Sequence, residues 1–591
     1  MMSTRTERPQ ETEMSDPTAQ RTLPRLLLAS AERFGDAPAV IDGDVTLSFR
    51  QLRDAAFEVA RAAIAHGIAR HDLIGIWAPN SVRWIVASLG LHCAGATVVP
   101  VNTRFRGDEA RDILARVRAK VVLVEDGFLG FDYAAAALTP GDDPERNAAL
   151  RDLLVIDLTG PSAPDAGRLS DDGRGSSRSQ ARFAGRLATG DDGRGSSRSQ
   201  DRFAGRLATG WADFMAGASS VSAEAAYDRA AEVDPSDLSE VIFTSGTTGR
   251  AKGVTLPHGT SLDLYADYGR IWGLRPGDRY LVQLPLFHTA GNKAGMITSI
   301  MHGLTIVPMA VFDPVEAMRL IERHGVSVMN GSPTVFYSLL ESPKRRDFDL
   351  SSLRVAATGA AVVPVALVER ARTELPFRHF ITAYGMTECC GTATMCRAGD
   401  SADVIANTNG RALPGIELRV VDLEGRDLQT GEQGQVLIRG ANVTPGYWED
   451  PVATADAIDA DGWLHSGDIG TLDAEGNLKI TDRLKDIFFV GGFNVSPAEV
   501  EQVLARHPAI AEVAVIGVPD ERLGEVPRAY AVPRLDAAPA TSEEIIAWAR
   551  ERLANFKVPR VVEFVTTLPR NASGKVLKGE LRAATHDRPA P

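Results

Sequence analysis

The stretch from residue 312 to residue 384 alternates regularly between helix-type and strand-type patterns, and this order strongly constrains the fold. The pattern predicts a helix at about 313–325, and Pro333 and Pro364 suit the first turns of two further helices. Alternation of this kind builds a parallel sheet with helices on both faces, whose ligands collect at the carboxyl ends of the strands. An α/β fold is therefore expected, with strands at Val326–Met329, Leu353–Ala357 and His379–Ala383.

Two loops follow these predicted strands and carry groups suited to a nucleotide. The small residues of Thr358–Ala361 would let a flat ring lie against the backbone. The loop Tyr384–Glu388 offers an aromatic face, a hydroxyl group and a carboxylate. Because carboxyl ends of parallel strands meet at one edge of a sheet, the two loops together fit a nucleotide with a metal ion.

A third loop, Thr244–Gly253, has the sequence TSGTTGRAKG and follows a predicted strand at Glu240–Phe243. Its glycines would let backbone N–H groups approach a polyphosphate, and Lys252 would add a positive charge. The spacing is not the GxxxxGK[ST] of a Walker A loop. Taken alone, such a cluster is equally compatible with a solvated turn.

The last hundred or so residues predict a small α+β domain, joined to the rest near Thr481–Asp486. Ser496 is a predicted helix N-cap, with Pro497 at the first helical position and Glu499 as the capping-box carboxylate. A second helix is expected at about 542–554. Strands are expected at roughly 510–518, 528–535 and 560–566.

Composition limits the functional classes. The chain has 591 residues, of which 44% are hydrophobic, so two or more domains are expected. A net charge of −13 argues against a general nucleic-acid or anionic-membrane surface. Residues 1–20 lack the apolar core of a signal peptide, and Trp84–Val101 reads as a buried helix followed by a strand. A cytoplasmic location fits the few cysteines, which lack zinc-type spacing: Cys93, Cys389, Cys390 and Cys396.

Residues 171–190 recur at 191–210 with the single change of Ala181 to Asp201. One duplicated Gly/Ser/Arg-rich unit does not make a solenoid, which needs at least three stacked repeats. Arginines fall every four residues, so a basic helical stripe is one interpretation; a mobile surface insertion over 165–210 is the other and is favoured. The ordered core is expected to resume near Trp211.

Seven motifs in one order resemble the adenylate-forming acyl-CoA synthetases over about residues 24–585, excluding the repeat. They are TSGTTGRAKG, LPLFH (Leu284–His288), TGAA (Thr358–Ala361), YGMTE (Tyr384–Glu388), GWLHSGDIG (Gly462–Gly470), TDRLKD (Thr481–Asp486) and PRNASGK (Pro569–Lys575). Within that family, GGFNVSPAEVEQVLA and LANFKVPR are most similar to actinobacterial ligases of fatty-acid and steroid-fragment breakdown. The resemblance implies a large N-terminal domain of mixed and parallel sheets layered with helices, at 24–484. A mobile C-terminal domain would follow at 485–585, with tails at 1–23 and 586–591.

The resemblance implies a two-step reaction. A carboxylate attacks the α-phosphorus of MgATP to give acyl-adenylate and pyrophosphate, and coenzyme A then displaces AMP. It implies that Tyr384 and Gly359, Ala360 and Ala361 flank adenine, that Asp468 and Arg483 bind ribose, and that Thr387 contacts the α-phosphate. Glu388 would bind Mg²⁺, a hard oxygen ligand for a hard ion. The β- and γ-phosphates would be held by Thr244, Ser245, Gly246, Thr247, Thr248, Gly249 and Lys252. In isolation, an aspartate in such a turn is usually a local cap.

Lys575 is implied to be the lysine that bridges the substrate carboxylate and the α-phosphate. An ammonium group with an ordinary pKa near 10.4 is charged at pH 7 and can neutralise two anions that otherwise repel each other. The PRNASGK sequence also resembles a lysine-acetylation context. A lysine acetyltransferase or deacetylase acting on Lys575 is therefore an expected partner, and a homodimer is a further expectation.

The two half-reactions require the small domain to turn between them, and the implied hinge is Lys485. Gly491, Gly492 and Phe493 would then line the coenzyme A channel. Ala251 stands where relatives usually have proline, which we expect to loosen the phosphate loop slightly.

The acyl pocket is expected around His288, Gly291, Lys293 and Gly391, where many small residues suggest a bulky or long acid. His288 is interpreted as a steric gate rather than a base, because the carboxylate arrives ionised. Lys293 is either a contact for a polar group of a steroid-derived acid or, more simply, a salt-bridged surface lysine. Cys389 and Cys390 are expected to be packing residues.

Three other functions remain open from the sequence. The adenylate could pass to a carrier protein instead of coenzyme A, although the GGFN segment weighs against it. A nucleotide-binding regulator without chemistry is disfavoured because Thr387, Glu388, Asp468, Arg483 and Lys575 are all present. A plain ATPase would need no carboxylic acid.

Overall fold

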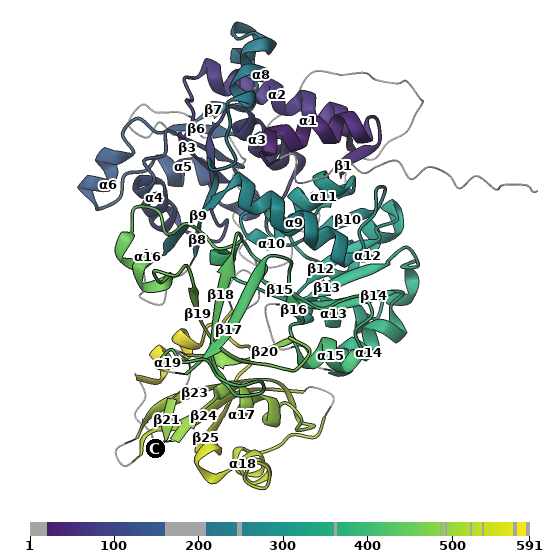
Figure 1. Cartoon of the computed structure of the whole chain (residues 1–591), viewed down its shortest axis with the longest axis vertical. Helices are drawn as coiled ribbons and strands as arrows, with labels where there is room; N and C mark the ends of the chain where they lie inside the picture. The colour runs from purple at the N-terminus through teal and green to yellow at the C-terminus, as the bar shows by residue number, and fades with distance from the viewer. Residues whose placement is uncertain are drawn as a thin grey trace, which may run out of the picture.

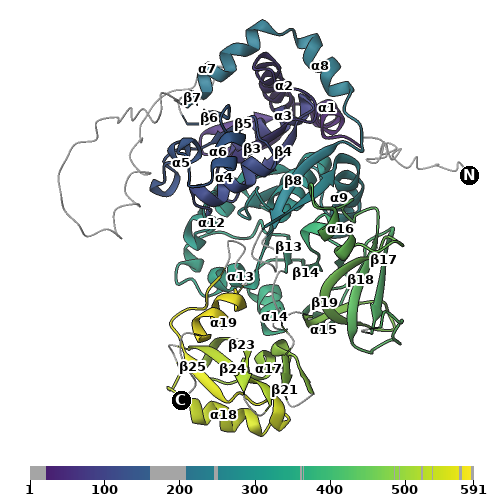
Figure 2. The ribbon, with the colours of Figure 1, turned by 90° about the vertical axis from the view of Figure 1, so that its left-hand side faces the viewer.

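A computed structural model describes residues 21–159, 208–244, 251–359, 363, 365–422, 424–484, 486, 488–490, 493–520, 523–534, 537–570 and 576–586. Two large sheets with their helices form the upper body of the molecule, and a smaller C-terminal unit lies below them (Figure 1). A four-stranded sheet lies between the two parts; it is on the right in Figure 2. The expected α/β class with a smaller C-terminal domain is confirmed.

The first large sheet has seven strands in the order β7-β6-β5-β3-β4-β8-β9. All neighbours are parallel except β8 and β9, which form the hairpin around the loop at 244–253. The strands are β3 (Leu73–Trp77), β4 (Thr97–Pro100), β5 (Val121–Val124), β6 (Leu154–Asp157), β7 (Thr209–Gly210), β8 (Leu238–Thr244) and β9 (Lys252–Pro257). Residues 49–231 also form the helices α2 (Phe49–Ala65), α3 (Val82–Cys93), α4 (Gly107–Arg116), α5 (Tyr133–Leu138), α6 (Pro144–Ala149), α7 (Trp211–Ala216) and α8 (Ala223–Ala231).

The predicted buried helix and strand within Trp84–Val101 are confirmed as α3 and β4, whose residues are almost all buried. Among the described residues, no helix is both long and apolar enough to cross a membrane. After the undescribed residues, β7 begins at Thr209 and α7 at Trp211. Residues 1–20 and 160–207, which include most of the repeat, lie outside the described residues.

The second large sheet has the order β16-β15-β14-β13-β12-β10-β11-β1-β2. Its central strands, from β14 to β1, are parallel, which satisfies the alternation in the sequence. They are β1 (Pro38–Asp42), β2 (Val45–Ser48), β10 (Arg279–Val282), β11 (Thr305–Pro308), β12 (Val328–Gly331), β13 (Val355–Thr358), β14 (His379–Tyr384), β15 (Thr394–Met395) and β16 (Arg411–Ala412). The helices are α1 (Leu23–Phe34), α9 (His258–Trp272), α10 (Thr289–Gly291), α11 (Thr298–His302), α12 (Pro314–His324), α13 (Pro333–Leu340), α14 (Val365–Glu374) and α15 (Ala402–Asn407).

The predicted helix at 313–325 is confirmed as α12, with Asp313 as its N-cap and Gly325 in the left-handed conformation at its end. The strand predicted at 326–329 is shifted by two residues, because β12 begins where Val328 pairs with β10 and β13. Residues 326 and 327, which were expected in the strand, instead connect the end of α12 to β12.

The four-stranded sheet is antiparallel, in the order β17-β18-β19-β20. It consists of β17 (Ile416–Val421), β18 (Gly434–Gly440), β19 (Leu464–Leu472) and β20 (Leu478–Arg483), with α16 (Pro451–Ala457) between β18 and β19. Asp468 lies in β19, and β20 leads the chain into the C-terminal unit.

The C-terminal unit is a five-stranded sheet with its own apolar core. Its elements are β21 (Phe488–Val490), β22 (Phe493–Val495), α17 (Pro497–Leu504), β23 (Ile510–Asp520), β24 (Gly524–Pro533), α18 (Ser542–Arg550), β25 (Val561–Phe564) and α19 (Lys578–His586). The predicted N-cap is confirmed, since the Ser496 side chain accepts from the Glu499 N–H. The Glu499 carboxylate does not complete the expected capping box; it pairs with Lys557 at 2.6 Å instead. The helix expected to reach residue 554 ends at Arg550.

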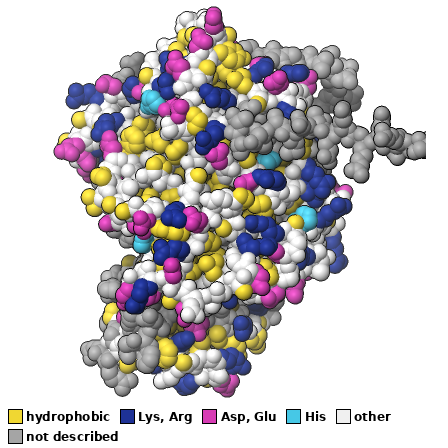
Figure 3. Space-filling model, in the orientation of Figure 1, with side chains coloured by type: hydrophobic (Ala, Val, Ile, Leu, Met, Phe, Trp, Pro, Cys, Tyr) yellow, Lys and Arg dark blue, Asp and Glu magenta, His cyan; other side chains and the backbone are white. Residues whose placement is uncertain are grey.

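Charged side chains of both signs are interspersed over most of the face drawn in Figure 3.

Candidate active site

A cavity of about 3040 Å³ opens where the two large sheets, the four-stranded sheet and the C-terminal unit meet. The carboxyl ends of four strands line it: Thr244 of β8, Gly331 of β12, Thr358 of β13 and Tyr384 of β14. This is the edge at which parallel sheets collect their ligands. The three loops singled out in the sequence therefore start from one cavity.

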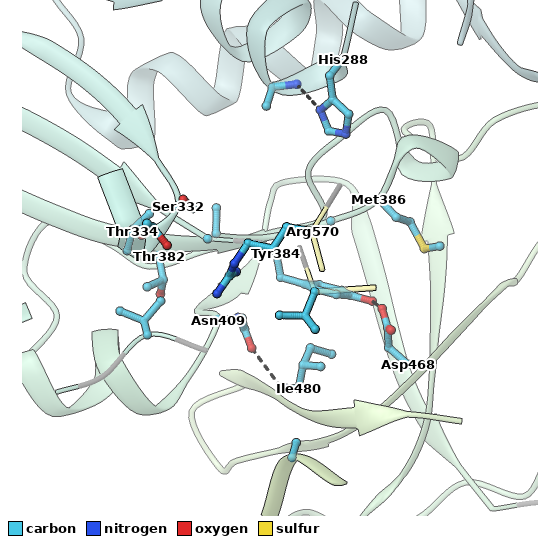
Figure 4. A pocket seen from close by; sticks show the side chains of 18 of the residues that line it. His288, Ser332, Thr334, Thr382, Tyr384, Met386, Asn409, Asp468, Ile480 and Arg570 are labelled. Atoms are coloured by element: carbon cyan, nitrogen blue, oxygen red, sulfur yellow. Dashed lines mark hydrogen bonds between the residues drawn. The ribbon is translucent and has the colours of Figure 1, made fainter. Parts of the chain in front are cut away.

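Tyr384 and Asp468 meet across the cavity wall (Figure 4). The Tyr384 hydroxyl donates to Asp468 Oδ2 at 2.6 Å, and the Asp468 N–H donates to the Ser466 hydroxyl at 3.1 Å. Burial, and then the neighbouring Asp468 carboxylate, raise the pKa of Tyr384 well above its ordinary value, so the phenol stays a donor. This pair presents an aromatic face and a carboxyl group side by side.

Gly359 lines the same wall and has a steric reason to be glycine. A Cβ there would lie 2.8 Å from the carbonyl oxygen of Ala383 on the neighbouring strand. The backbone of Arg483 lies opposite Asp468 in the ladder of β19 and β20, which brings these two sequence motifs together. The side chain of Arg483 is outside the described part of the chain.

The phosphate-loop hairpin brings Thr244 and Lys252 opposite each other on β8 and β9, and both residues line the cavity. Arg116 of α4, which the sequence reasoning missed, anchors the loop's end: its guanidinium donates to the Ala251 carbonyl at 2.6 Å. The same guanidinium lies 4.9 Å from the ring centroid of Phe243. Ala251, where proline was expected in relatives, is thus held by a side chain from another element.

Thr387 and Glu388 lie in a short 3-10 turn after β14, and both are buried while lining the cavity. The Tyr447 hydroxyl donates to Glu388 Oε1 at 3.0 Å. No ion pair of Glu388 occurs within the part of the chain that the structure describes. No cluster of three or more metal-ligating side chains occurs there either, so a cation at this carboxylate would need ligands from elsewhere, such as phosphate oxygens.

His288 also lines the cavity, at a distance from the group formed by Tyr384 and Asp468 (Figure 4). It caps α10, where its Nδ1 accepts from the Ala290 N–H at 3.2 Å. Burial lowers the pKa of His288, so the imidazole is neutral at pH 7. Tyr265, Tyr268 and Ala294 line the cavity as well.

Two predicted pocket glycines have different roles. Gly391 lines the cavity with a φ of +98°, and a Cβ there would meet the Tyr265 hydroxyl at 2.8 Å. Gly291 is not among the lining residues. A Cβ at Gly291 would lie 2.2 Å from the Pro285 carbonyl, so it is small because the backbone approaches closely and not because the acid needs room.

Lys293 does not line the cavity, so the substrate-contact interpretation is wrong; the salt-bridge interpretation is right about the ion pair and wrong about its place at the surface. Its side chain is 0% exposed and forms an ion pair with Glu240 of β8, whose side chain is equally buried. His92 Nε2 lies 3.6 Å from the same carboxylate, and the Ser239 hydroxyl lies 3.3 Å from Lys293 Nζ. Lys293 is thus salt-bridged, but in the interior. A glutamate among Val241, Ile242 and Phe243 was the sequence signal for a buried partner.

Cys389 and Cys390 are fully buried in apolar clusters, which confirms them as packing residues. Burial raises the pKa of Cys389 to about 12 and that of Cys390 above its ordinary value, so neither thiol is reactive at neutral pH.

Several predicted site residues lie outside the described residues: Ser245, Gly246, Thr247, Thr248, Gly249, Ala360, Ala361, Lys485, Gly491, Gly492 and Lys575. The Phe493 side chain is also not described. Arg570 and Val576, which precede and follow 571–575, form an antiparallel bridge and both line the cavity. Figure 4 shows Arg570 in the group that includes Tyr384 and Asp468.

The comparison with known proteins decides the family. The AMP-binding enzyme model matches residues 27–448, and the AMP-binding enzyme C-terminal domain model matches residues 499–575. The chain belongs to the AMP-binding enzymes.

Two relatives of this AMP-binding enzyme are each named 3-[(3aS,4S,7aS)-7a-methyl-1,5-dioxo-octahydro-1H-inden-4-yl]propanoyl:CoA ligase. The Rhodococcus jostii (strain RHA1) protein is 45% identical over 562 residues, covering 95% of this chain and 98% of the relative. The Mycobacterium tuberculosis (strain ATCC 25618 / H37Rv) protein is 46% identical over 567 residues, with the same coverage.

Solved structures agree with this assignment. A Mycobacterium tuberculosis fatty acyl CoA synthetase is 29% identical with a TM-score of 0.67, covering 95% of this chain and 98% of the other. The anthranilate CoA ligase AuaEII, solved with anthranoyl-AMP, is 25% identical with a TM-score of 0.77, covering 95% and 97%. This AMP-binding enzyme is an ATP-dependent acid–CoA ligase that acts through an acyl-adenylate.

Proposed function

We propose that this ligase activates a propanoate side chain carried on a bulky, fused-ring acid, of the kind released by partial breakdown of a steroid. The observation that carries the proposal is the identity of 45% and 46%, over almost the full length of both chains, to two ligases named for such an acid. The acyl end of the cavity supports it, because tyrosine rings and small side chains provide apolar walls for a rigid ring system.

In the adenylation step, the protein positions the two reactants and neutralises their charge. Tyr384 and Gly359, with Ala360 and Ala361, would hold adenine. Asp468 would accept hydrogen bonds from the ribose hydroxyls, and Arg483 would donate to them. Thr387 would contact the α-phosphate. Thr244 and Lys252 would hold the leaving pyrophosphate together with Ser245, Gly246, Thr247, Thr248 and Gly249.

Glu388 fits a Mg²⁺ ion bound with the phosphates. Its carboxylate lines the cavity in a residue that is only 9% exposed, and one of its oxygens accepts the hydrogen bond of Tyr447. Mg²⁺ is usually held by one or two carboxylates plus substrate phosphates, and it would there neutralise the charge that develops on the leaving pyrophosphate.

Lys575 would bridge the carboxylate and the α-phosphate. Support comes from its two flanks, since Arg570 and Val576 both line the cavity. Acetylation would remove this charge and switch adenylation off. Mass spectrometry of the native protein tests this, and an unmodified Lys575 under every growth condition would contradict it.

The thioester step would follow a rotation of the C-terminal domain, 485–585, about Lys485 relative to 24–484. Gly491, Gly492 and Phe493 would then line the pantetheine channel. His288 would act as a steric gate toward the acyl pocket, because its neutral imidazole cannot neutralise the incoming carboxylate.

The test is product analysis with MgATP, coenzyme A and single acids: short to long fatty acids, aryl acids and fused-ring propanoates. The expected result is one mole of AMP, one of pyrophosphate and one of thioester per fused-ring propanoate consumed. Pyrophosphate without thioester would contradict the coenzyme A acceptor and indicate a carrier protein. Phosphate release without any acid would contradict the ligase itself.

A further inference from the structure

A segment from the four-stranded sheet joins the phosphate hairpin to the acidic turn. Residues 442–448, the linking segment, follow β18 and precede α16. The Thr444 N–H donates to the Glu388 carbonyl at 2.8 Å. On the other side, the Thr255 N–H donates to Gly446 at 3.1 Å, and the Trp448 N–H donates to Gly253 at 2.7 Å. Two parts of the site that come from different sheets are therefore fixed to the same few residues.

Tyr447 makes the same connection with its side chain. Its hydroxyl donates to Glu388 Oε1 at 3.0 Å, and Lys252 Nζ lies 4.9 Å from the centroid of its ring. Its backbone pairs with Val254 of β9 as an antiparallel bridge, and its N–H donates to the Thr454 hydroxyl at 2.9 Å. The Tyr447 side chain thus contacts one anion through its hydroxyl and one cation through its ring, and both charged residues line the cavity.

We propose that Tyr447 is a positioning residue: its hydroxyl fixes the Glu388 carboxylate for a divalent cation, and its ring holds Lys252 for the phosphates. The proposal rests on the nucleotide site described above. A carboxylate with one oxygen occupied by a fixed donor presents its other oxygen in a single orientation. Partners of this kind orient metal ligands, and their loss typically weakens metal binding 10–100-fold. A cation lying over a tyrosine ring is held electrostatically without losing its hydrogen-bond donors.

The two functions of Tyr447 can be separated by substitution. Tyr447→Phe keeps the ring beside Lys252 and removes only the hydroxyl. Tyr447→Leu removes both. Tyr227→Phe is the matched control, because Tyr227 is 40% exposed on α8 and lies in a different part of the chain, stacked on Phe57.

The experiment measures binding of Mn²⁺, as a probe for Mg²⁺, by electron paramagnetic resonance on the full-length enzyme with a non-hydrolysable ATP analogue. Binding of Mn²⁺ to the analogue alone is measured separately and subtracted. Tyr447→Phe should weaken Mn²⁺ binding about tenfold or more. Its affinity for the metal-free analogue should stay within about twofold, because Lys252 keeps its ring contact. Tyr447→Leu should weaken both, and Tyr227→Phe neither.

Mn²⁺ affinity within about twofold of wild type in the Phe variant would overturn the proposal. So would equal weakening of Mn²⁺ and metal-free analogue in that variant, since this indicates a distorted site. A wild-type enzyme that binds the analogue but gains no Mn²⁺ site would overturn it as well. If Tyr447→Phe loses Mn²⁺ affinity as expected, yet the wild-type enzyme ligates none of the acids, the proposed function fails and the role of Tyr447 stands.

Discussion

The Tyr384 hydroxyl donates to the Asp468 carboxylate at 2.6 Å and so joins β14 of the large sheet to β19 of the four-stranded sheet. The two residues are 84 positions apart, and the contact forms only because both sheets border one cavity. It fixes the carboxylate that is proposed to bind ribose against the ring that is proposed to stack on adenine.

Tyr384→Phe should therefore impair ATP binding while leaving the fold intact. A hydrogen bond to a charged group contributes about 1.5–3 kcal/mol, so KM for ATP should rise about tenfold or more. KM for the acid should change little, because the acyl wall at His288 is untouched. Steady-state kinetics with each substrate varied would measure this. A KM for ATP within twofold of wild type would show that the contact does not orient the carboxylate.

The buried pair of Lys293 and Glu240 should dominate the stability of the core beneath the site. Lys293→Met leaves the buried Glu240 carboxylate without its lysine partner and should lower the free energy of unfolding by about 3–5 kcal/mol. The double variant Lys293→Met/Glu240→Gln removes both charges and should recover most of that loss. Urea unfolding of the two variants makes the comparison, and a double variant as unstable as the single one would refute charge pairing as the cause.

Stability should fall as the pH drops below about 6.5, the ordinary pKa of histidine. Burial, and then the charge of His92, hold the pKa of His258 well below that value, and its Nδ1 accepts from the Leu23 N–H at 3.2 Å. Below pH 6.5 His258 takes up a proton in the unfolded chain but stays neutral in the folded protein. The stability that depends on neutral His258 is therefore complete above pH 6.5 and is lost as the pH falls.

The pKa of Glu240 is also lowered by folding, but this group reduces the stability of the protein only below about pH 4.5, the pKa of the carboxyl group in the unfolded chain. His258→Gln should thus be less stable than wild type at pH 8, and the difference should shrink toward pH 5.5. Denaturant midpoints across this range test the idea; a constant difference would contradict it.

His288→Ala should change selectivity more than rate. The neutral imidazole lines the acyl end, and an ionised acid carries no carboxyl proton for it to remove. We expect kcat within about tenfold of wild type, whereas removing a general base typically lowers it 10²–10⁴-fold. KM should fall for acids bulkier than the preferred one. A kcat loss of a hundredfold with every acid would instead identify a base.

Lys575→Ala should lower adenylation about 10²–10³-fold, as removal of one preorganised charged donor does. Thioester formation from supplied acyl-adenylate should suffer much less. Lys485→Pro should show the reverse, because a restricted hinge impairs only the second step. Single-turnover assays of each half-reaction separate these outcomes, and equal losses in both steps for either variant would contradict its assigned role.

The periodic stretch at residues 312–384 predicted strands of the second large sheet, because helices and parallel strands each leave a local sequence pattern. α12 matches its prediction closely, whereas β12 is shifted because pairing with β10 and β13, not its own sequence, sets where it begins. The nucleotide motifs mark Tyr384 and Asp468 by their order along the chain.

Contacts between distant residues escaped prediction. Lys293 and Glu240 are 53 positions apart; the apolar neighbours of Glu240 indicate that it has a buried partner, but no local pattern identifies that partner as Lys293. Tyr447 likewise follows a strand of a different sheet from Glu388, so only the tertiary arrangement shows that the two meet. Gly291 was read as room for substrate, although the Pro285 carbonyl excludes a side chain there.

A competition assay tests the central claim most directly. The enzyme receives MgATP, limiting coenzyme A and equal amounts of a fused-ring propanoate and a straight-chain fatty acid, and mass spectrometry quantifies both thioesters. The account predicts that the fused-ring thioester exceeds the fatty acyl thioester by at least about tenfold, a difference of 1.4 kcal/mol between the two transition states. Equal amounts, or a majority of fatty acyl thioester, would contradict the proposed substrate class.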